Sequence, residues 1–207
     1  MINEIKDIDT LKKEFDAVPS TDSLAFVNFF EQNISSVENI NQDKDEAHYN
    51  AKLHFECEYG ISLFGSGQYT KATKVLCRTI PMFENAPNQV KSELKNISYF
   101  EHLLWCYAVS LFETKALKDS IKQLERLVEY KPQNDKYINW LKALKGQKIS
   151  RLIKPLWIFI YIWLIGKFTF FEMFNSELQF RLTIIGGFIL LTTVGFELYI
   201  YLIKKKK

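Results

Sequence analysis

The sequence lacks most of the features that mark a secreted protein or a metal site. Its three cysteines, Cys57, Cys77 and Cys106, lie far apart and form no Cys-x-x-Cys pair. Neither a zinc site nor a disulfide framework is therefore expected. The first residues are acidic and include no apolar run of signal-peptide length, which predicts a cytosolic N-terminus.

Signals for catalysis are equally scarce. No glycine-rich loop followed by lysine is present, so a phosphate-binding loop is not expected. Two His–Cys pairs stand at helical spacing, His54 with Cys57 and His102 with Cys106, but neither has a supporting third group nearby. The sequence therefore predicts that the protein is not an enzyme and has no catalytic residue, no cofactor and no metal.

Strand-like alternation is also missing. Between residues 20 and 150 the apolar residues recur with helical spacing and are separated by brief breaks. This pattern predicts an all-α class, with a helical cytosolic domain over residues 20–154. Residues 1–19, which lack a sustained pattern, are expected to form a flexible arm.

Charge is distributed unevenly along the chain. Residues 1–135 contain 15 Lys or Arg against 21 Asp or Glu, whereas residues 136–154 contain six bases and no acid. An acidic body with a basic segment before an apolar tail does not indicate a nucleic-acid binder. Five of the bases recur every three residues along the expected helix. They would form a ring around it, which suits contact with anionic lipid headgroups. We call them the headgroup collar: Lys142, Lys145, Lys148, Arg151 and Lys154.

Two long apolar stretches follow the collar, at residues 156–174 and 182–203. Nineteen helical residues reach roughly 28 Å, about the thickness of the hydrocarbon layer. The polar connector, residues 175–181, is short, so a transmembrane hairpin of two antiparallel helices is expected. Basic flanks, including the tail Lys204 to Lys207, place both chain ends in the cytosol. The membrane would be a bacterial inner membrane or, alternatively, the endoplasmic reticulum or another organelle.

The hairpin contains two ionisable residues deep in its apolar stretches, Lys167 and Glu197. Their depths differ by roughly 8 Å, which a lysine side chain can largely span. An intramembrane pair is the simpler interpretation, and a proton or ion path is the alternative. Thr183 and Gly187, four residues apart, suggest a small-residue contact face.

Two segments of the helical domain align with each other at an offset of 48 residues, namely 59–72 and 107–120. Small residues recur at Gly60 and Ala108 and again at Ala72 and Ser120, where two helices would approach closely. Together these positions resemble the tetratricopeptide repeat (TPR), a helix–turn–helix of about 34 residues. The resemblance covers residues 53–86 and 101–134, with a capping helix at 135–154. One departure is Glu56, which stands where the family has a bulky residue.

The resemblance implies a concave groove lined by the first helix of each repeat. The groove would be apolar and aromatic, and would suit an amphipathic helix, an extended peptide or the protein's own N-terminal arm. The alternative is that its two phenylalanines are simply core residues. Transferred to this chain, the family's groove positions are His54, Cys57, Ile61, Phe64, His102, Trp105, Val109 and Phe112.

The sequence as a whole predicts a membrane-anchored adaptor that recruits a protein partner to the cytosolic membrane face. This architecture is similar to that of the mitochondrial fission adaptor family, which has one span where this chain has two. The alternative is a small subunit of a transport or secretion complex, in which the hairpin packs against other subunits as a homo- or hetero-oligomer. No nucleic-acid partner is expected.

Overall fold

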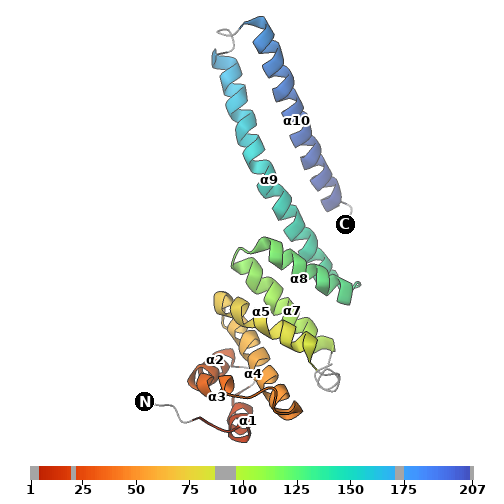
Figure 1. Cartoon of the computed structure of the whole chain (residues 1–207). Coiled ribbons are helices and arrows are strands. Elements are labelled where there is room, and N and C mark those ends of the chain that lie inside the picture. The colour runs from red at the N-terminus through yellow and green to blue at the C-terminus, as the bar shows by residue number, and fades with distance from the viewer. Residues whose placement is uncertain (1–4, 20–21, 87–96, 171–174, 206–207) are drawn as a thin grey trace. The chain divides into compact units, whose positions relative to one another are not determined.

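The structure is a computed structural model that describes residues 5–19, 22–86, 97–170 and 175–205. Over these ranges every regular element is a helix and no strand forms, which confirms the predicted all-α class. The chain divides into an N-terminal unit, residues 1–141, and a C-terminal unit, residues 142–207 (Figure 1). The helices are α1 (Ile8–Asp16), α2 (Ser23–Gln32), α3 (Ile34–Glu38), α4 (Glu46–Gly65), α5 (Tyr69–Asn85), α7 (Ile97–Glu113), α8 (Leu117–Tyr130), α9 (Asp135–Phe170) and α10 (Ser176–Lys205).

Three helices of the N-terminal unit begin at an aspartate. The carboxylates of Asp7, Asp22 and Asp45 each accept a hydrogen bond from a backbone N–H two or three residues later, at 2.8–3.0 Å. Each cap satisfies a donor that the first helical turn leaves unpaired, which stabilises a helix by about 1 kcal/mol. The starts of α1, α2 and α4 therefore follow from local sequence.

Helix pairing organises the rest of this unit. Helix α4 packs along α5, α7 packs along α8, and α5 joins the two pairs by packing against α7 (Figure 1). Helix α2 also packs against α4. The core between them is aliphatic and aromatic. Its largest fully buried side chains include Phe55, Leu53, Leu63, Leu76, Leu103, Leu104, Leu124 and Leu127.

The two helix pairs close with the same turn, 48 residues apart. Gly67 follows α4 with φ 76°, and Lys115 occupies the corresponding place after α7 with φ 65°. In each turn the next residue donates its N–H to the carbonyl oxygen five residues back, at 2.8 Å in the first pair and 2.9 Å in the second. A left-handed residue after a helix end is a common termination. The turn geometry thus repeats with the sequence offset.

The predicted close approaches are present in both pairs. A Cβ atom on Gly60 would lie 2.5 Å from Leu76 Cδ2, so only glycine fits there without a shift of that side chain. In the second pair the Ser120 hydroxyl donates to the carbonyl oxygen of Ala108 at 2.7 Å. Ala72 is fully buried. Small side chains therefore let the helices of each pair approach.

Glu56, the departure from the repeat pattern, has a structural explanation. Its side chain is only 6% exposed, and Arg78 on α5 donates to it from Nε and Nη2, both at 2.9 Å. A two-pronged guanidinium–carboxylate contact has a favourable geometry for a buried acid. The polar pair therefore occupies the α4–α5 contact that a bulky apolar residue would otherwise fill.

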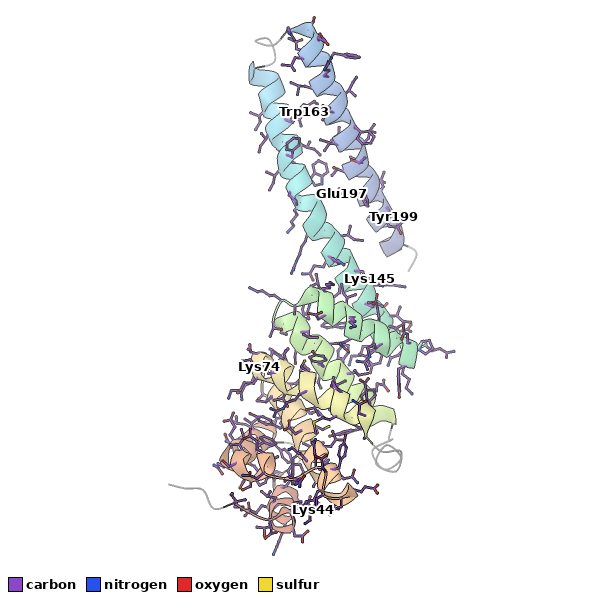
Figure 2. All side chains as sticks on the ribbon, viewed as in Figure 1. Lys44, Lys74, Lys145, Trp163, Glu197 and Tyr199 are labelled. Atoms are coloured by element: carbon purple, nitrogen blue, oxygen red, sulfur yellow. The ribbon has the colours of Figure 1, made fainter. Side chains whose placement is uncertain are left out.

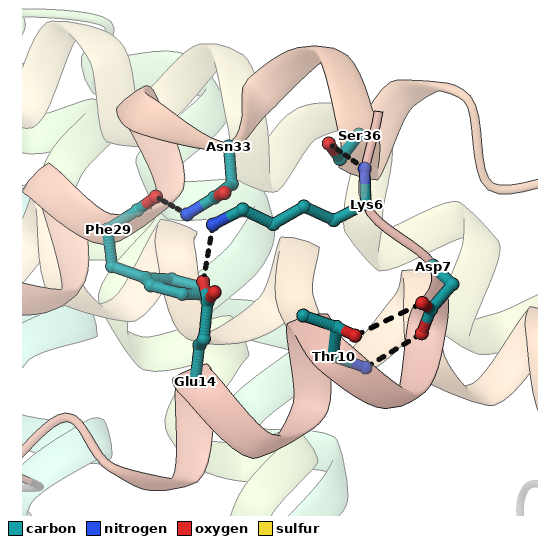
Figure 3. A network of polar contacts seen from close by, with 7 residues as sticks. All are labelled: Lys6, Asp7, Thr10, Glu14, Phe29, Asn33 and Ser36. Carbon is teal, nitrogen blue, oxygen red and sulfur yellow. Dashed lines mark hydrogen bonds and ion pairs between the residues drawn. The ribbon is translucent and has the colours of Figure 1, made fainter. Parts of the chain in front are cut away.

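The N-terminal segment, which the sequence predicts to be a flexible arm, contains a helix in the structure. Residues 1–4 lie outside the described residues, but residues 8–16 form α1, whose Leu11 and Phe15 are buried. The Lys6 backbone N–H donates to Ser36 Oγ at 3.0 Å, and its ammonium pairs with Glu14 at 2.6 Å (Figure 3). The prediction of a loose arm was wrong here because the two apolar residues, four apart on a short helix, find a tertiary site.

The C-terminal unit contains the later part of α9 and all of α10, which run antiparallel (Figure 1). Over the described residues one helical segment, Ser176–Tyr199, is long and apolar enough to span a membrane, and 11% of its apolar window is buried. On α9 the described apolar segment, Trp157–Gly166, is shorter than a span. Residues 171–174 of the predicted first span lie outside the described residues, so the two-span hairpin is not confirmed.

Candidate functional site

The predicted groove residues come in equal numbers from α4 and α7. These two helices contact each other, and the Tyr99 hydroxyl of α7 donates to Glu58 Oε1 of α4 at 2.8 Å. Cys57 and Val109 are buried, whereas the other six side chains remain partly or fully accessible. Two of the eight positions are therefore core, and the binding role of the remaining six stays a prediction.

On α4 the groove residues are partly covered by neighbouring aromatic side chains. The Phe15 ring of α1 lies 5.2 Å from the His54 ring, edge to face. Phe64 contacts Tyr69 at the start of α5, with ring centroids 5.9 Å apart. Ile61, between these two contacts along the helix, is half-buried. Helix α1 therefore covers one end of the row of groove residues on α4.

On α7 the groove residues join an aromatic cluster formed with the first turns of α9. Trp140 lies 5.2 Å from Trp105 and 5.6 Å from Phe112, in both cases near perpendicular. The Tyr137 ring is 5.4 Å from Trp105. The Lys136 ammonium lies 3.9 Å from the centroid of the Trp105 ring, a cation–π contact. Trp105 and Phe112 are thus held by a common neighbour while remaining half-exposed.

Sequence reasoning identified only part of this cluster. Tyr137, in the first turn of the capping helix, is buried, and its hydroxyl donates to Glu101 Oε1 at 2.6 Å. Burial raises the pKa of Tyr137. Trp140 was missed, although its spacing of three from Tyr137 puts it on the same helix face.

The cysteines of the two His–Cys pairs are not in the protonation state that a nucleophile requires. Cys106 Sγ lies 3.6 Å from His102 Nε2, but burial raises the pKa of Cys106 to about 12 and also raises that of Cys57. Burial lowers the pKa of His102. At neutral pH both thiols stay protonated, whereas a nucleophile or a metal ligand needs the thiolate. Within the described ranges no three His, Cys, Asp or Glu side chains gather as a metal ion requires.

In the C-terminal unit Glu197 accepts a hydrogen bond from a residue that sequence reasoning did not pair with it. Trp157 Nε1 of α9 donates to Glu197 Oε1 of α10 at 2.9 Å. The side chain of Lys167 lies outside the described residues, so the predicted Lys167–Glu197 pair stays a prediction. This bond joins α9 to the C-terminal half of α10, where Glu197 is labelled in Figure 2.

A second contact between these helices lies at Gly186. The Trp163 indole rests where a Cβ on Gly186 would stand, so any larger residue would displace it (Figure 2). The sequence pointed instead to Thr183 and Gly187. Gly187 has no such neighbour, and the Thr183 hydroxyl donates to its own helix, at Gln179 O. The predicted contact face was thus one residue off, because the choice between adjacent glycines depends on where the opposing tryptophan lies.

All five headgroup-collar side chains are exposed on α9. They belong to the C-terminal unit, as do the described apolar residues that follow them. The collar side chains therefore lie at the surface, as lysine and arginine side chains usually do.

Comparison with known proteins identified no relative: no protein-family model, no curated protein and no solved structure matches the chain. The TPR resemblance therefore depends on the repeat positions and on the paired turns described above.

Proposed function

We propose that the chain is a membrane-anchored adaptor whose TPR-like N-terminal unit recruits a protein partner to the cytosolic face of a membrane. One observation carries the membrane half of this proposal. Among the described residues, seventeen large apolar side chains are exposed in the C-terminal unit and four in the longer N-terminal unit. Water disfavours so much exposed apolar surface, whereas a bilayer accepts it on helices.

The proposed topology has two spans, residues 156–174 and 182–203, with both chain ends in the cytosol. The basic collar and the lysine tail support this orientation through the preference of basic flanks for the cytosolic side. The second span is supported independently by the length and apolar character of Ser176–Tyr199.

The proposed binding surface is the groove of α4 and α7. Half-exposed Ile61, Trp105 and Phe112 offer apolar contacts of the kind that an amphipathic helix or an extended peptide would cover. Aromatic side chains supply much of the binding energy in such interfaces.

The second candidate function is that of a subunit in a membrane transport or secretion complex. The exposed apolar side chains of α9 and α10 favour it, because other membrane helices could cover them as well as lipid does. In that case the identity of the hairpin, and not only its insertion, would matter for function.

A crosslinking experiment on the full chain in its native membrane separates the two candidates. A photo-reactive amino acid at Ile61 should give a discrete protein adduct, and one at Lys118, exposed on α8, should not. Under the adaptor proposal the adduct survives replacement of residues 155–207 by an unrelated two-span anchor. Loss of the adduct in that chimera would favour the complex subunit, and equal adducts from both positions would contradict the groove.

A further inference from the structure

An ammonium group already lies on the aromatic part of the α4–α7 groove. The Lys136 ammonium, at the start of α9, is 3.9 Å from the centroid of the Trp105 ring. The Lys136 side chain is exposed, and the ion pairs formed among the described residues involve other bases. In the described part of the chain, an aromatic ring and not a carboxylate therefore holds this charge.

Two carboxylates lie on the same pair of helices. The Tyr99 hydroxyl donates to Glu58 Oε1 at 2.8 Å, and the Tyr137 hydroxyl donates to Glu101 Oε1 at 2.6 Å. Both donors are neutral, and the ion pairs formed among the described residues use other acids. Neither hydroxyl neutralises the carboxylate that it contacts, so both remain available to a cation.

Charges of both signs act on the turn of α7 that carries Trp105. Burial lowers the pKa of His102, Glu58 raises it, and Lys136 lowers it further. At Cys106 burial raises the pKa, Lys136 lowers it and Glu58 raises it. Both charges must lie close to this turn, because solvent screens charges that are far apart. Since His102 is neutral at pH 7, the two carboxylates outweigh the single Lys136 charge among the described side chains of this region.

Building on the proposed groove, we infer that its Trp105 region binds an arginine side chain from a basic segment of the partner protein. We call this region the cation site and define it by Glu58, Glu101, Trp105 and Lys136. Tryptophan is the ring that best accepts a cation over its face, and a guanidinium also stacks on aromatic rings. The two carboxylates supply the complementary charge.

Lys136 is then an internal competitor for the cation site. Its ammonium must leave the Trp105 ring when the arginine binds. An exposed cation–π contact is worth about twofold to fivefold in an equilibrium constant, so the displacement costs little. The Trp140 ring, 5.2 Å from Trp105 and near perpendicular to it, packs against the Trp105 indole independently of Lys136. An acidic segment would instead need the Lys136 ammonium, so the two kinds of partner predict opposite effects of its removal.

Three matched peptides test the inference on the full chain in non-ionic detergent. All are synthetic amphipathic helices with leucines at i, i+3, i+4 and i+7, and they differ only in having Arg, Gln or Glu beside the apolar face. Fluorescence anisotropy of the labelled peptide follows binding, with protein-free detergent as the blank. We expect the affinity to fall from the Arg to the Gln to the Glu peptide. The Arg and Glu peptides should differ about tenfold at low salt, and less as salt screens the charges.

A lysine variant tests the competition. Lys136→Ala should raise the affinity for the Arg peptide about threefold, because it removes the competing ammonium from the ring. The matched control is Lys118→Ala, which removes an exposed lysine from the second residue of α8, as Lys136 is the second residue of α9. The control should leave the affinity unchanged.

An acid variant tests the complementary charge. Glu58→Gln combined with Glu101→Gln keeps an acceptor for each tyrosine hydroxyl and should lower the affinity for the Arg peptide about fivefold. Its control, Asp119→Asn combined with Glu129→Gln, removes two exposed acids of α8 and should not lower that affinity.

The outcomes separate the inference from the proposed function. Equal binding of all three peptides, weaker binding of the Arg peptide by Lys136→Ala, or equal effects of a variant and its control would overturn the cation site and leave the groove intact. If none of the three peptides binds, the groove fails as a site for an amphipathic helix, and the cation site fails with it.

Discussion

The N-terminal and C-terminal units are both helical, yet they treat apolar side chains in opposite ways. In the first unit, Leu53, Leu63 and Leu124 are fully buried between helices, and helix contacts run from α2 through α4, α5 and α7 to α8. In the second, Phe188 and Leu191 are at least 70% exposed. A helix in water is stabilised chiefly by burying one face. The difference implies that packing between its own helices stabilises the first unit, whereas the stability of the second depends on what covers its exposed apolar side chains.

Truncating a buried and an exposed leucine should show the largest contrast. Leu63→Ala removes a side chain that is fully buried between α4 and its neighbours, and should lower the free energy of unfolding by about 3–4 kcal/mol. Leu191→Ala, at a side chain 74% exposed, should change it by less than about 0.5 kcal/mol. Urea unfolding of the full chain in mild detergent, followed by tryptophan fluorescence, measures both. Equal losses of unfolding free energy in the two variants would contradict the proposed difference between the units.

The Glu56–Arg78 pair tests whether the first unit depends on a buried charge. Arg78→Ala leaves the buried carboxylate without its main partner and should cost about 2–3 kcal/mol of unfolding free energy. The double variant Glu56→Leu with Arg78→Leu restores an apolar residue at the position where the repeat family has one. It should recover most of that loss in the same unfolding assay. A double variant less stable than Arg78→Ala would show that the pair has a further role.

Gly186 and its neighbour give a matched comparison within the second unit. Gly186→Val should collide with Trp163 and weaken the contact between α9 and α10 by about 1–3 kcal/mol, whereas Gly187→Val meets nothing within 4 Å. Disulfide trapping between cysteines placed at Trp157 and Glu197, which lie across the same two helices, reports the contact. Similar trapping in both variants would argue against the tryptophan–glycine packing.

The two equivalent turns should give the smallest effects, of opposite sign. Lys115→Gly relieves a left-handed backbone at a non-glycine residue and should stabilise the N-terminal unit by up to about 1 kcal/mol. Gly67→Ala places a Cβ on a left-handed backbone and should destabilise by about 1 kcal/mol. Thermal unfolding measures both. Shifts of the same sign would mean that the turns differ despite their common dihedral angles.

Several structural features could be predicted because their signals are local. Helical periodicity indicated the all-α class, and the apolar run at residues 182–203 indicated a span-length helix, which the structure has at Ser176–Tyr199. The offset of 48 correctly located Gly60 and Ser120 at close helix contacts, because only small side chains fit there. Each of these properties can be seen within one helix or one repeat.

Other features depended on partners distant in sequence. Phe15 is buried because α2 and α4 provide a surrounding set of rings, and nothing within residues 8–16 reveals that set. Glu197 accepts a hydrogen bond from Trp157, forty residues away, and nothing near Glu197 in the sequence indicates that partner. In each case several partners were chemically acceptable, and packing selected among them.

The sequence by itself determined that the chain is helical, where aspartates start its helices, where charge gathers, and which stretch is apolar enough to span a membrane. These properties follow from backbone hydrogen bonding and side-chain solvation, which act over a few residues. Only the tertiary structure decided that α1 packs onto α4, that Trp140 links two groove residues, and that Trp163 lies against Gly186 and not Gly187. Those choices depend on shape complementarity between helices, which close packing enforces to within a methyl group.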